Sequence, residues 1–273
     1  MRGDGWGLKA LETYSSGGRA HEVAIFEHHR SGLEFALVPG GTFRMGSEPS
    51  EPGREADESQ HEVVLVQPFL LARTEFPQSA WERLFGENRS QYLGADRPVE
   101  TVSWEQATAA CRSLGLSLPS EAQWEFACRA GSTSAYSCGA APADLRGSAN
   151  LADAYLASHR IEVPHDTSKW RYTMNIDDGF AATAPRARFA PNGFGLYDMH
   201  GNVWEWCADG YAPYPTSRVL DPPGDPASPT RVCRGGSWRN PADLVRSACR
   251  FAVRPSDRSD SIGFRAARSL ALD

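Results

Sequence analysis

Thiol and imidazole side chains have the widest chemistry in this sequence, because both bind metals and both act as nucleophiles or bases. The adjacent His28 and His29 have no carboxylate at a ligand spacing, and we interpret them as surface histidines. We expect His61 and His200 to be structural hydrogen-bonding residues. The cysteines show no C-x-x-C pair and no metal-finger spacing; they are Cys111, Cys128, Cys138, Cys207, Cys233 and Cys249.

The composition indicates a globular protein that binds neither nucleic acid nor membranes. The chain has 273 residues, 41% of them hydrophobic, and a net charge of −6, so nothing draws it non-specifically to nucleic acid or anionic lipid. It contains no run of about 18 apolar residues, and its N-terminus lacks the apolar stretch of a secretory signal. We therefore expect a cytoplasmic protein with free thiols. One or two disulfides are the alternative if the protein is exported.

The elements that must position these side chains are mainly short strands. With 25 glycines and 19 prolines, the chain has many turns and long loops. Beyond residue 131, short aromatic runs alternate with loops rich in Gly, Pro, Asn and Asp. The predicted strands cover residues 22–26, 33–38, 42–45, 62–66, 69–71, 193–197, 203–206 and 230–233.

Helix signals are confined to the middle of the chain. Pro77 suits the first position of a helix. Ser103 with Gln106, and Ser120 with Gln123, have the spacing of capping boxes, which predicts that two further helices begin there.

One domain accounts for most of the chain. Residues 1–31 are mixed and polar, and we interpret them as an N-terminal extension that pairs a strand onto the main domain. Residues 32–273 show no internal repeat and no linker. We predict an α+β domain that is rich in loops, with two main helices on small antiparallel sheets.

Six sequence blocks occur in one order between residues 33 and 268, and together they resemble the formylglycine-generating enzyme (sulfatase-modifying factor) family. The resemblance implies the fold of that family, a loop-rich variant of the C-type lectin fold, in agreement with the α+β prediction. The blocks are FALVPGGTFRMG (35–46), RPVETVSW (97–104), LPSEAQWE (118–125), NGFGLYDMHGNVWEW (192–206), RGGSW (234–238) and GFR (263–265).

The same resemblance implies copper-dependent oxidation of a cysteine. The family holds copper with two cysteines, three and eight residues after the serine that aligns with Ser237; here these positions are Asn240 and Val245. Neither side chain replaces a thiolate, the soft ligand that copper(I) prefers. We therefore expect no copper, and rescue by Cys233 or Cys249 is the alternative. The related sulfoxide synthases use an iron-binding His-x-x-x-His-x-Glu motif that this chain lacks.

Two structural calcium sites are a further implication of the resemblance. Calcium prefers oxygen ligands and accepts backbone carbonyls among them. The alternative is that Asp178 and Asp198 form turns and that Glu205 is an exposed carboxylate. The first implied set is Asn150, Leu151, Asp178 and Phe180, and the second is Asp198, Gly201, Val203 and Glu205, with Leu151, Phe180, Gly201 and Val203 contributing carbonyls.

Bulky aromatic and cationic residues accompany the blocks. We expect the tryptophans to pack as core and loop clamps rather than as a ligand cage. We expect the arginines to pair with carboxylates inside the loops, and a grip on an anionic ligand is the alternative. These residues are Trp81, Trp104, Trp124, Trp204, Trp206 and Trp238, with Arg234, Arg246, Arg250 and Arg265.

Two functions fit these patterns. The first is a calcium-stabilised module that binds a protein or small molecule through its C-terminal segment, residues 239–261. That segment is similar to the one displayed by the variable proteins of diversity-generating retroelements. The alternative is an oxidoreductase with an altered metal site, which fold analogy alone supports. The candidate ligand-binding residues are Trp238, Arg239, Asn240, Asp243, Phe251, Val253, Arg254, Arg258 and Asp260.

Overall fold

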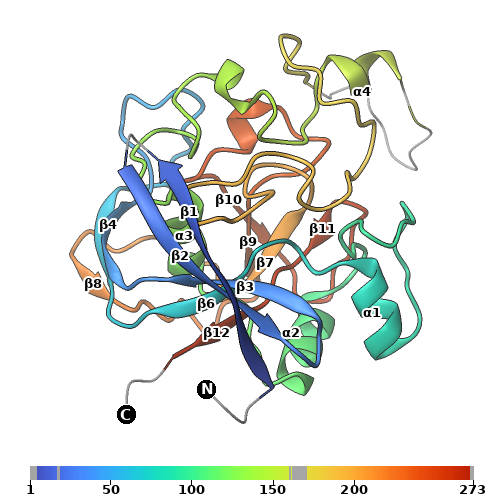
Figure 1. Ribbon diagram of the computed structural model, residues 1–273. Coiled ribbons are helices and arrows are strands. Elements are labelled where there is room, and N and C mark those ends of the chain that lie inside the picture. The colour runs from blue at the N-terminus through green and yellow to red at the C-terminus, as the bar shows by residue number, and fades with distance from the viewer. Residues whose placement is uncertain (1–4, 17–18, 160, 162–170, 271–273) are drawn as a thin grey trace.

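The largest sheet joins the two ends of the chain (Figure 1). The computed structural model describes residues 5–16, 19–159, 161 and 171–270. The β2 strand pairs with β3, as expected for the N-terminal extension, and β1 adds a further strand outside β2. All neighbouring strands are antiparallel, in the order β1 (Trp6–Ser16), β2 (Arg19–His28), β3 (Leu33–Val38), β6 (Phe69–Ala72) and β12 (Ala267–Ser269).

Two smaller sheets complete the strand architecture. Each contains one short parallel pair, β7 with β11 and β5 with β8, while their other pairs are antiparallel as predicted. The four-stranded sheet has the order β10 (Arg250–Val253), β9 (Arg231–Arg234), β7 (Trp204–Gly210) and β11 (Ile262–Gly263). The three-stranded sheet has the order β4 (Gly41–Met45), β5 (His61–Leu65) and β8 (Val219–Leu220).

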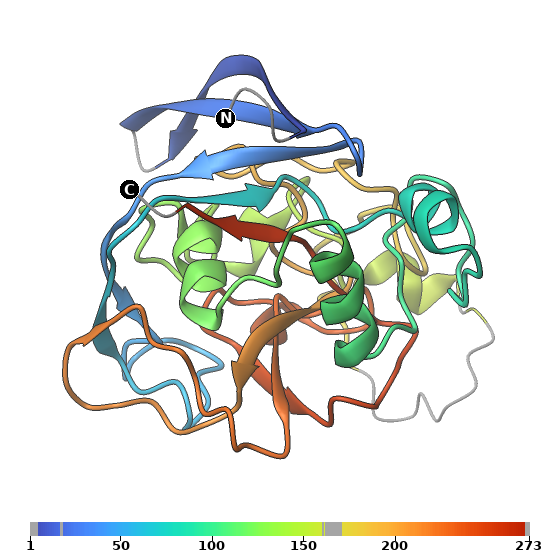
Figure 2. The same cartoon turned by 90° about the horizontal axis from the view of Figure 1, so that it is seen from below.

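Two helices lie between the five-stranded and four-stranded sheets, as Figure 2 shows. Both begin at the predicted capping boxes: Ser103 caps α2 (Trp104–Ser113), and Ser120 caps α3 (Glu121–Arg129). The described residues also form α1 (Gln78–Phe85), α4 (Ala154–Ser158) and 3-10 turns at Pro142–Leu145 and Ala242–Leu244. Pro77 is the N-cap of α1, so its predicted place inside the helix is wrong by one residue.

The core divides around these two helices. Ala107 and Cys111 of α2 pack with Phe35 and Leu70 of the five-stranded sheet and with Trp206 of β7. A second cluster surrounds α3 and includes residues from all three sheets: Ala122, Trp124, Leu71, Val63, Cys207 and Val232. The α+β class is therefore confirmed, with α2 and α3 at the centre of the domain.

Two further local predictions are wrong. Residues 193–197 form a turn rather than a strand, because the Asn192 Oδ1 accepts hydrogen bonds from Phe194 N–H and Leu196 N–H. His28 is buried rather than exposed, since β1 brings Trp6 against its ring at 4.7 Å between centroids. His29 is exposed as predicted.

The four predicted arginines pair with carboxylates as expected, although the partners of three of them lie on α3 or β7 rather than in loops. Five of the six predicted tryptophan clamps are buried, and half-buried Trp104 donates from Nε1 to the Cys207 carbonyl at 2.8 Å. The pairs are Arg234 with Glu121 and Glu125, Arg246 with Glu51 and Glu58, Arg250 with Glu121, and Arg265 with Glu205.

All six cysteines are unpaired, and five of them are buried. Among the helices of the described residues, none has both the length and the apolar character needed to span a membrane.

Candidate functional site

The four residues of the first implied calcium set lie together. The Asp178 carboxylate accepts hydrogen bonds from Leu151 N–H at 2.9 Å and from Phe180 N–H at 2.8 Å. The Asn150 Oδ1 atom is buried and has no hydrogen-bond partner among the described residues. Burial, with the neighbouring charge of Asp153, raises the pKa of Asp178 to about 7. The site therefore has a half-buried carboxylate, together with a buried amide oxygen that no hydrogen-bond donor among the described residues reaches. A bound cation would supply the missing positive charge and contact these oxygens.

In the second implied set, Glu205 forms a buried ion pair with Arg265. Both oxygens of Glu205 accept from Arg265 at 2.6 Å, and its Oε2 also accepts from Trp124 Nε1 at 2.7 Å. The Oδ2 of Asp198 accepts from Ala187 N–H at 2.7 Å, whereas its buried Oδ1 has no partner in the described part of the chain. Glu205 is therefore neutralised by Arg265, and Asp198 supplies the oxygen that is free to bind a cation.

Glu75 is a member of this cluster that the sequence analysis missed. It is fully buried between β6 and α1, and its Oε1 is a third oxygen without a partner among the described residues. Burial raises the pKa of Glu75 well above its usual range, and the charges of Asp198 and Glu205 raise it further. Arg265 pairs with Glu205 and also acts on Glu75 and Asp198, and Arg186 adds positive charge near Asp198. Burial still disfavours the ionised carboxylates of Glu75 and Asp198, which a cation or bound protons would balance.

Asn202, also missed, bridges the two sets. Its Oδ1 accepts from Asn150 Nδ2 at 3.0 Å, and its Nδ2 donates to Glu75 Oε2 at 3.1 Å. The adjacent Gly201 has φ +84°, and a Cβ there would lie 1.8 Å from the Asn150 carbonyl oxygen. Glycine is therefore required where the two loops cross.

The two implied calcium sets consist of oxygen ligands, several of them backbone or amide oxygens, unlike the His and Cys ligands typical of a transition-metal centre. In the residues that the structure describes, no group of three or more His, Cys, Asp or Glu side chains is placed to hold a metal ion. In each of the two implied calcium sets, two of the four oxygens would come from backbone carbonyls. Oxygen donors of this kind suit calcium.

The two positions implied for copper cysteines hold no sulfur. The Asn240 Oδ1 accepts from Ser237 Oγ at 2.6 Å, and Val245 is fully buried in an apolar cluster with Tyr136 and Leu145. Cys233 and Cys249 are buried, and burial raises the pKa of the Cys249 thiol to about 12. Neither thiol is therefore readily converted to the thiolate that binds copper.

The predicted ligand-binding residues differ in exposure. Phe251 is 51% exposed, and its ring lies 5.5 Å from that of Trp204. Near the start of the segment, Arg239 pairs with Asp260 at 3.1 Å. Exposed side chains are those of Phe251, Arg254 and Arg258; Arg239, Asn240 and Asp243 are half-buried; Trp238, Val253 and Asp260 are buried. The buried three shape the surface, and the exposed three offer contact area.

Comparison with known proteins identifies the relatives of this chain. Residues 22–270 match the sulfatase-modifying factor enzyme 1-like domain family. The formylglycine-generating enzyme of Streptomyces coelicolor is 35% identical over 70% of this chain and 59% of that protein. The formylglycine-generating enzyme of Thermomonospora curvata is 29% identical over 84% of this chain and 91% of that protein. The mouse inactive C-alpha-formylglycine-generating enzyme 2 is 32% identical over 71% of this chain and 56% of that protein.

Two solved structures share the whole fold. PvdO from Pseudomonas aeruginosa superposes with a TM-score of 0.73 and 25% identity, covering 96% of this chain and all of that one. Treponema denticola variable protein 1 superposes with a TM-score of 0.70 and 25% identity, covering 95% of this chain and 99% of that one. This chain spans about three fifths of the length of the Streptomyces and mouse proteins and nearly all of the Thermomonospora protein. The sequence blocks, the fold and these matches agree: the chain belongs to the sulfatase-modifying factor enzyme 1-like domain family.

Proposed function

We propose that this protein is a calcium-stabilised module that binds a protein or small-molecule ligand through residues 239–261. The observation that carries the proposal is the replacement of both copper cysteines by Asn240 and Val245 in an otherwise intact fold. Similarity to an inactive formylglycine-generating enzyme and to a variable protein supports a role in binding rather than oxidation. The alternative, an oxidoreductase with an altered metal site, has less support because Cys233 and Cys249 are buried.

The three unpartnered buried oxygens of Asn150, Asp198 and Glu75 support calcium as the bound ion. We propose both calcium sets with the ligands that the resemblance implies, and we add Glu75 beside the second set. The six unpaired cysteines support a reducing, cytoplasmic location. The net charge of −6 gives no reason to expect nucleic acid or a membrane as partner.

We expect the purified protein to contain calcium and to leave a sulfatase-type cysteine peptide unchanged in the presence of copper and oxygen. Without thiolates at residues 240 and 245, copper(I) lacks its preferred ligands. Elemental analysis of the protein measures bound calcium and copper, and mass spectrometry of the peptide measures conversion of its cysteine. An active formylglycine-generating enzyme is the positive control. Stoichiometric bound copper together with oxygen-dependent conversion of the peptide would contradict the proposal.

Phe251→Ala and Arg254→Ala are each expected to weaken ligand binding about tenfold, since exposed aromatic and Arg side chains dominate interfaces. Peptides selected from a displayed random library on the wild-type protein provide the ligands, and calorimetry measures their affinity for each variant. Melting temperatures should stay nearly unchanged. Leu220→Ala, which removes an exposed apolar side chain from β8, is the matched control. If the selected peptides bind both face variants as tightly as wild type, this surface is not the binding site.

A further inference from the structure

The strand β10 is one edge of the four-stranded sheet, and it lies inside the proposed binding segment. It pairs with β9 on one side, and no strand of the described residues pairs with its other side. Phe251 and Ala252 are adjacent in β10, so their side chains point to opposite faces of the sheet, and both are exposed. The backbone N–H and C=O groups on the free side of an edge strand can pair with a further strand.

Phe251 provides an apolar contact along this edge. Its exposed ring packs against that of buried Trp204, with 5.5 Å between the ring centroids. Val253 shares the face of Phe251 because the two residues lie two positions apart, and Val253 pairs with Arg231 of β9. The Arg231 guanidinium lies 4.5 Å from the centroid of the Trp104 ring. An added strand would therefore find an aromatic surface and a cation on this face.

Two exposed cations follow β10 directly. Arg254 pairs with Asp257 at 3.0 Å, an exposed pair of the kind that contributes little to stability and can exchange partners. Arg258 donates from Nε to the neutral Gln106 Oε1 at 2.9 Å, and it forms no ion pair within the described part of the chain. Both guanidiniums are therefore available to a carboxylate of a ligand.

The local charge decides which strand this edge accepts. Residues 250–258 contain three arginines and a single carboxylate, whereas the whole chain has a net charge of −6. Arg250 is neutralised in the interior by Glu121, so Arg254 and Arg258 are the cations that face solvent. A second copy of this chain would bring the same cations to the edge. The edge therefore disfavours pairing with itself and is complementary to an acidic partner.

We propose that the ligand is an extended acidic peptide segment that adds to the free edge of β10 as an antiparallel strand. This inference rests on the proposed function and names the ligand class for residues 239–261. Antiparallel pairing is the more stable arrangement and continues the pattern of β10 with β9. It places the N-terminal residues of the peptide beside Arg254 and Arg258, and an apolar residue that follows them packs on Phe251.

A designed peptide tests the charge requirement by fluorescence anisotropy. The probe is acetyl-Asp-Asp-Val-Thr-Val-Thr-Val with a dye at its C-terminus. We expect it to bind with a dissociation constant below about 1 mM. The matched peptide with two lysines in place of the aspartates should bind at least about tenfold more weakly. This difference should shrink at high salt, which screens exposed charges.

Main-chain methylation tests strand addition itself. Alternate N–H groups of a strand point to opposite edges, so methylating the valine nitrogens and methylating the threonine nitrogens block opposite edges of the probe. One of the two methylated peptides should bind at least about tenfold more weakly than the parent, because it loses its hydrogen bonds to β10. The other should bind within about twofold of the parent.

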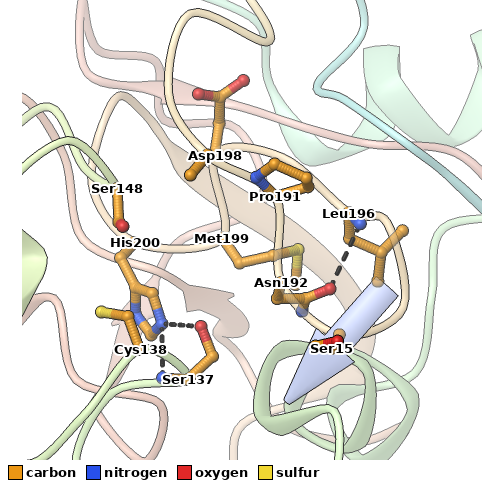
Figure 3. A pocket seen from close by; sticks show the side chains of 12 residues that line it. Ser15, Ser137, Cys138, Ser148, Pro191, Asn192, Leu196, Asp198, Met199 and His200 are labelled. Carbon is orange, nitrogen blue, oxygen red and sulfur yellow. Dashed lines mark hydrogen bonds between the residues drawn. The ribbon is translucent and has the colours of Figure 1, made fainter. Parts of the chain in front are cut away.

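Protein variants locate the acidic end of the peptide. Arg258→Gln should weaken binding of the acidic probe about threefold to fivefold. It should leave unchanged the affinity for a probe with two asparagines in place of the aspartates. Arg218→Gln removes another exposed cation, before β8, and is the matched control. Ser148→Ala is a second control, since Ser148 lines a cavity of about 240 Å³ whose lining includes no residue of β10 (Figure 3).

The outcomes separate this inference from the proposed function. Absent binding of the acidic probe, equal binding of the acidic and lysine probes, or equal affinities of the two methylated peptides would each overturn strand addition. A dimer of the unliganded protein in light scattering that Phe251→Ala dissociates would do so too, because a second copy would then occupy the edge. If library-selected peptides still lose affinity in Phe251→Ala, binding through residues 239–261 stands without strand addition.

Discussion

Replacing Arg234 by methionine is expected to lower the free energy of unfolding by about 3–5 kcal/mol, because it leaves a buried charge network without its central cation. The Arg234 side chain is fully buried and pairs with both Glu121 and Glu125 of α3. It also donates to the Ser247 and Ala248 carbonyls at 2.7 and 3.1 Å. The substitution therefore separates β9 from α3 and from the chain that precedes β10.

Thermal and chemical denaturation measure this loss, which corresponds to a fall in melting temperature of roughly 10 °C or more. Arg254→Met is the matched control, since the Arg254 side chain is 76% exposed and pairs with nearby Asp257. An exposed pair contributes at most about 1 kcal/mol. Equal destabilisation by the two substitutions would contradict the assignment of Arg234 as the central cation.

Removal of calcium is expected to lower the melting temperature by roughly 5–10 °C. A ligand that binds only the folded chain stabilises it by about 2.7 kcal/mol at a hundredfold excess over its dissociation constant. Each kcal/mol corresponds to about 2–4 °C in a domain of this size. The physical reason is local: Asp198 Oδ1 and Glu75 Oε1 are buried without partners among the described residues, and their carboxylates repel each other.

Scanning calorimetry with calcium or with chelator measures this shift, and elemental analysis gives the stoichiometry. Asp198→Ala should bind one calcium ion fewer than wild type and lose most of the thermal response to calcium. Asp257→Ala, which removes a less buried carboxylate from the C-terminal segment, should behave as wild type. Identical melting curves with and without chelator would show that these carboxylates only form turns.

Local signals explain what the sequence predicted well. Ser103 and Ser120 begin their helices because each side chain accepts from a backbone N–H only three residues later. The strand at Leu33–Val38 was predicted to the residue from its alternating pattern. Such features need no information from the rest of the chain.

Distant contacts explain what the sequence could not predict. Glu75 has no spacing signal, since its amide partner Asn202 is 127 residues away. The predicted strand at 193–197 failed because Asn192 turns the chain and donates to the carbonyls of Ala127 and Cys128 in α3. The sequence therefore predicted the family and most elements, but not the contacts that complete the sites.

The C-terminal segment separates the positions that hold the fold from the positions that face solvent. Arg246 and Arg250 point inward to Glu58 and Glu121, while Phe251 and Arg254 point outward. Selection for stability acts on the inward positions, and selection for a new ligand can act on the outward ones with little cost in folding. If residues 239–261 bind a ligand as proposed, the outward side chains can change to suit a new ligand while the inward ion pairs keep the backbone in place.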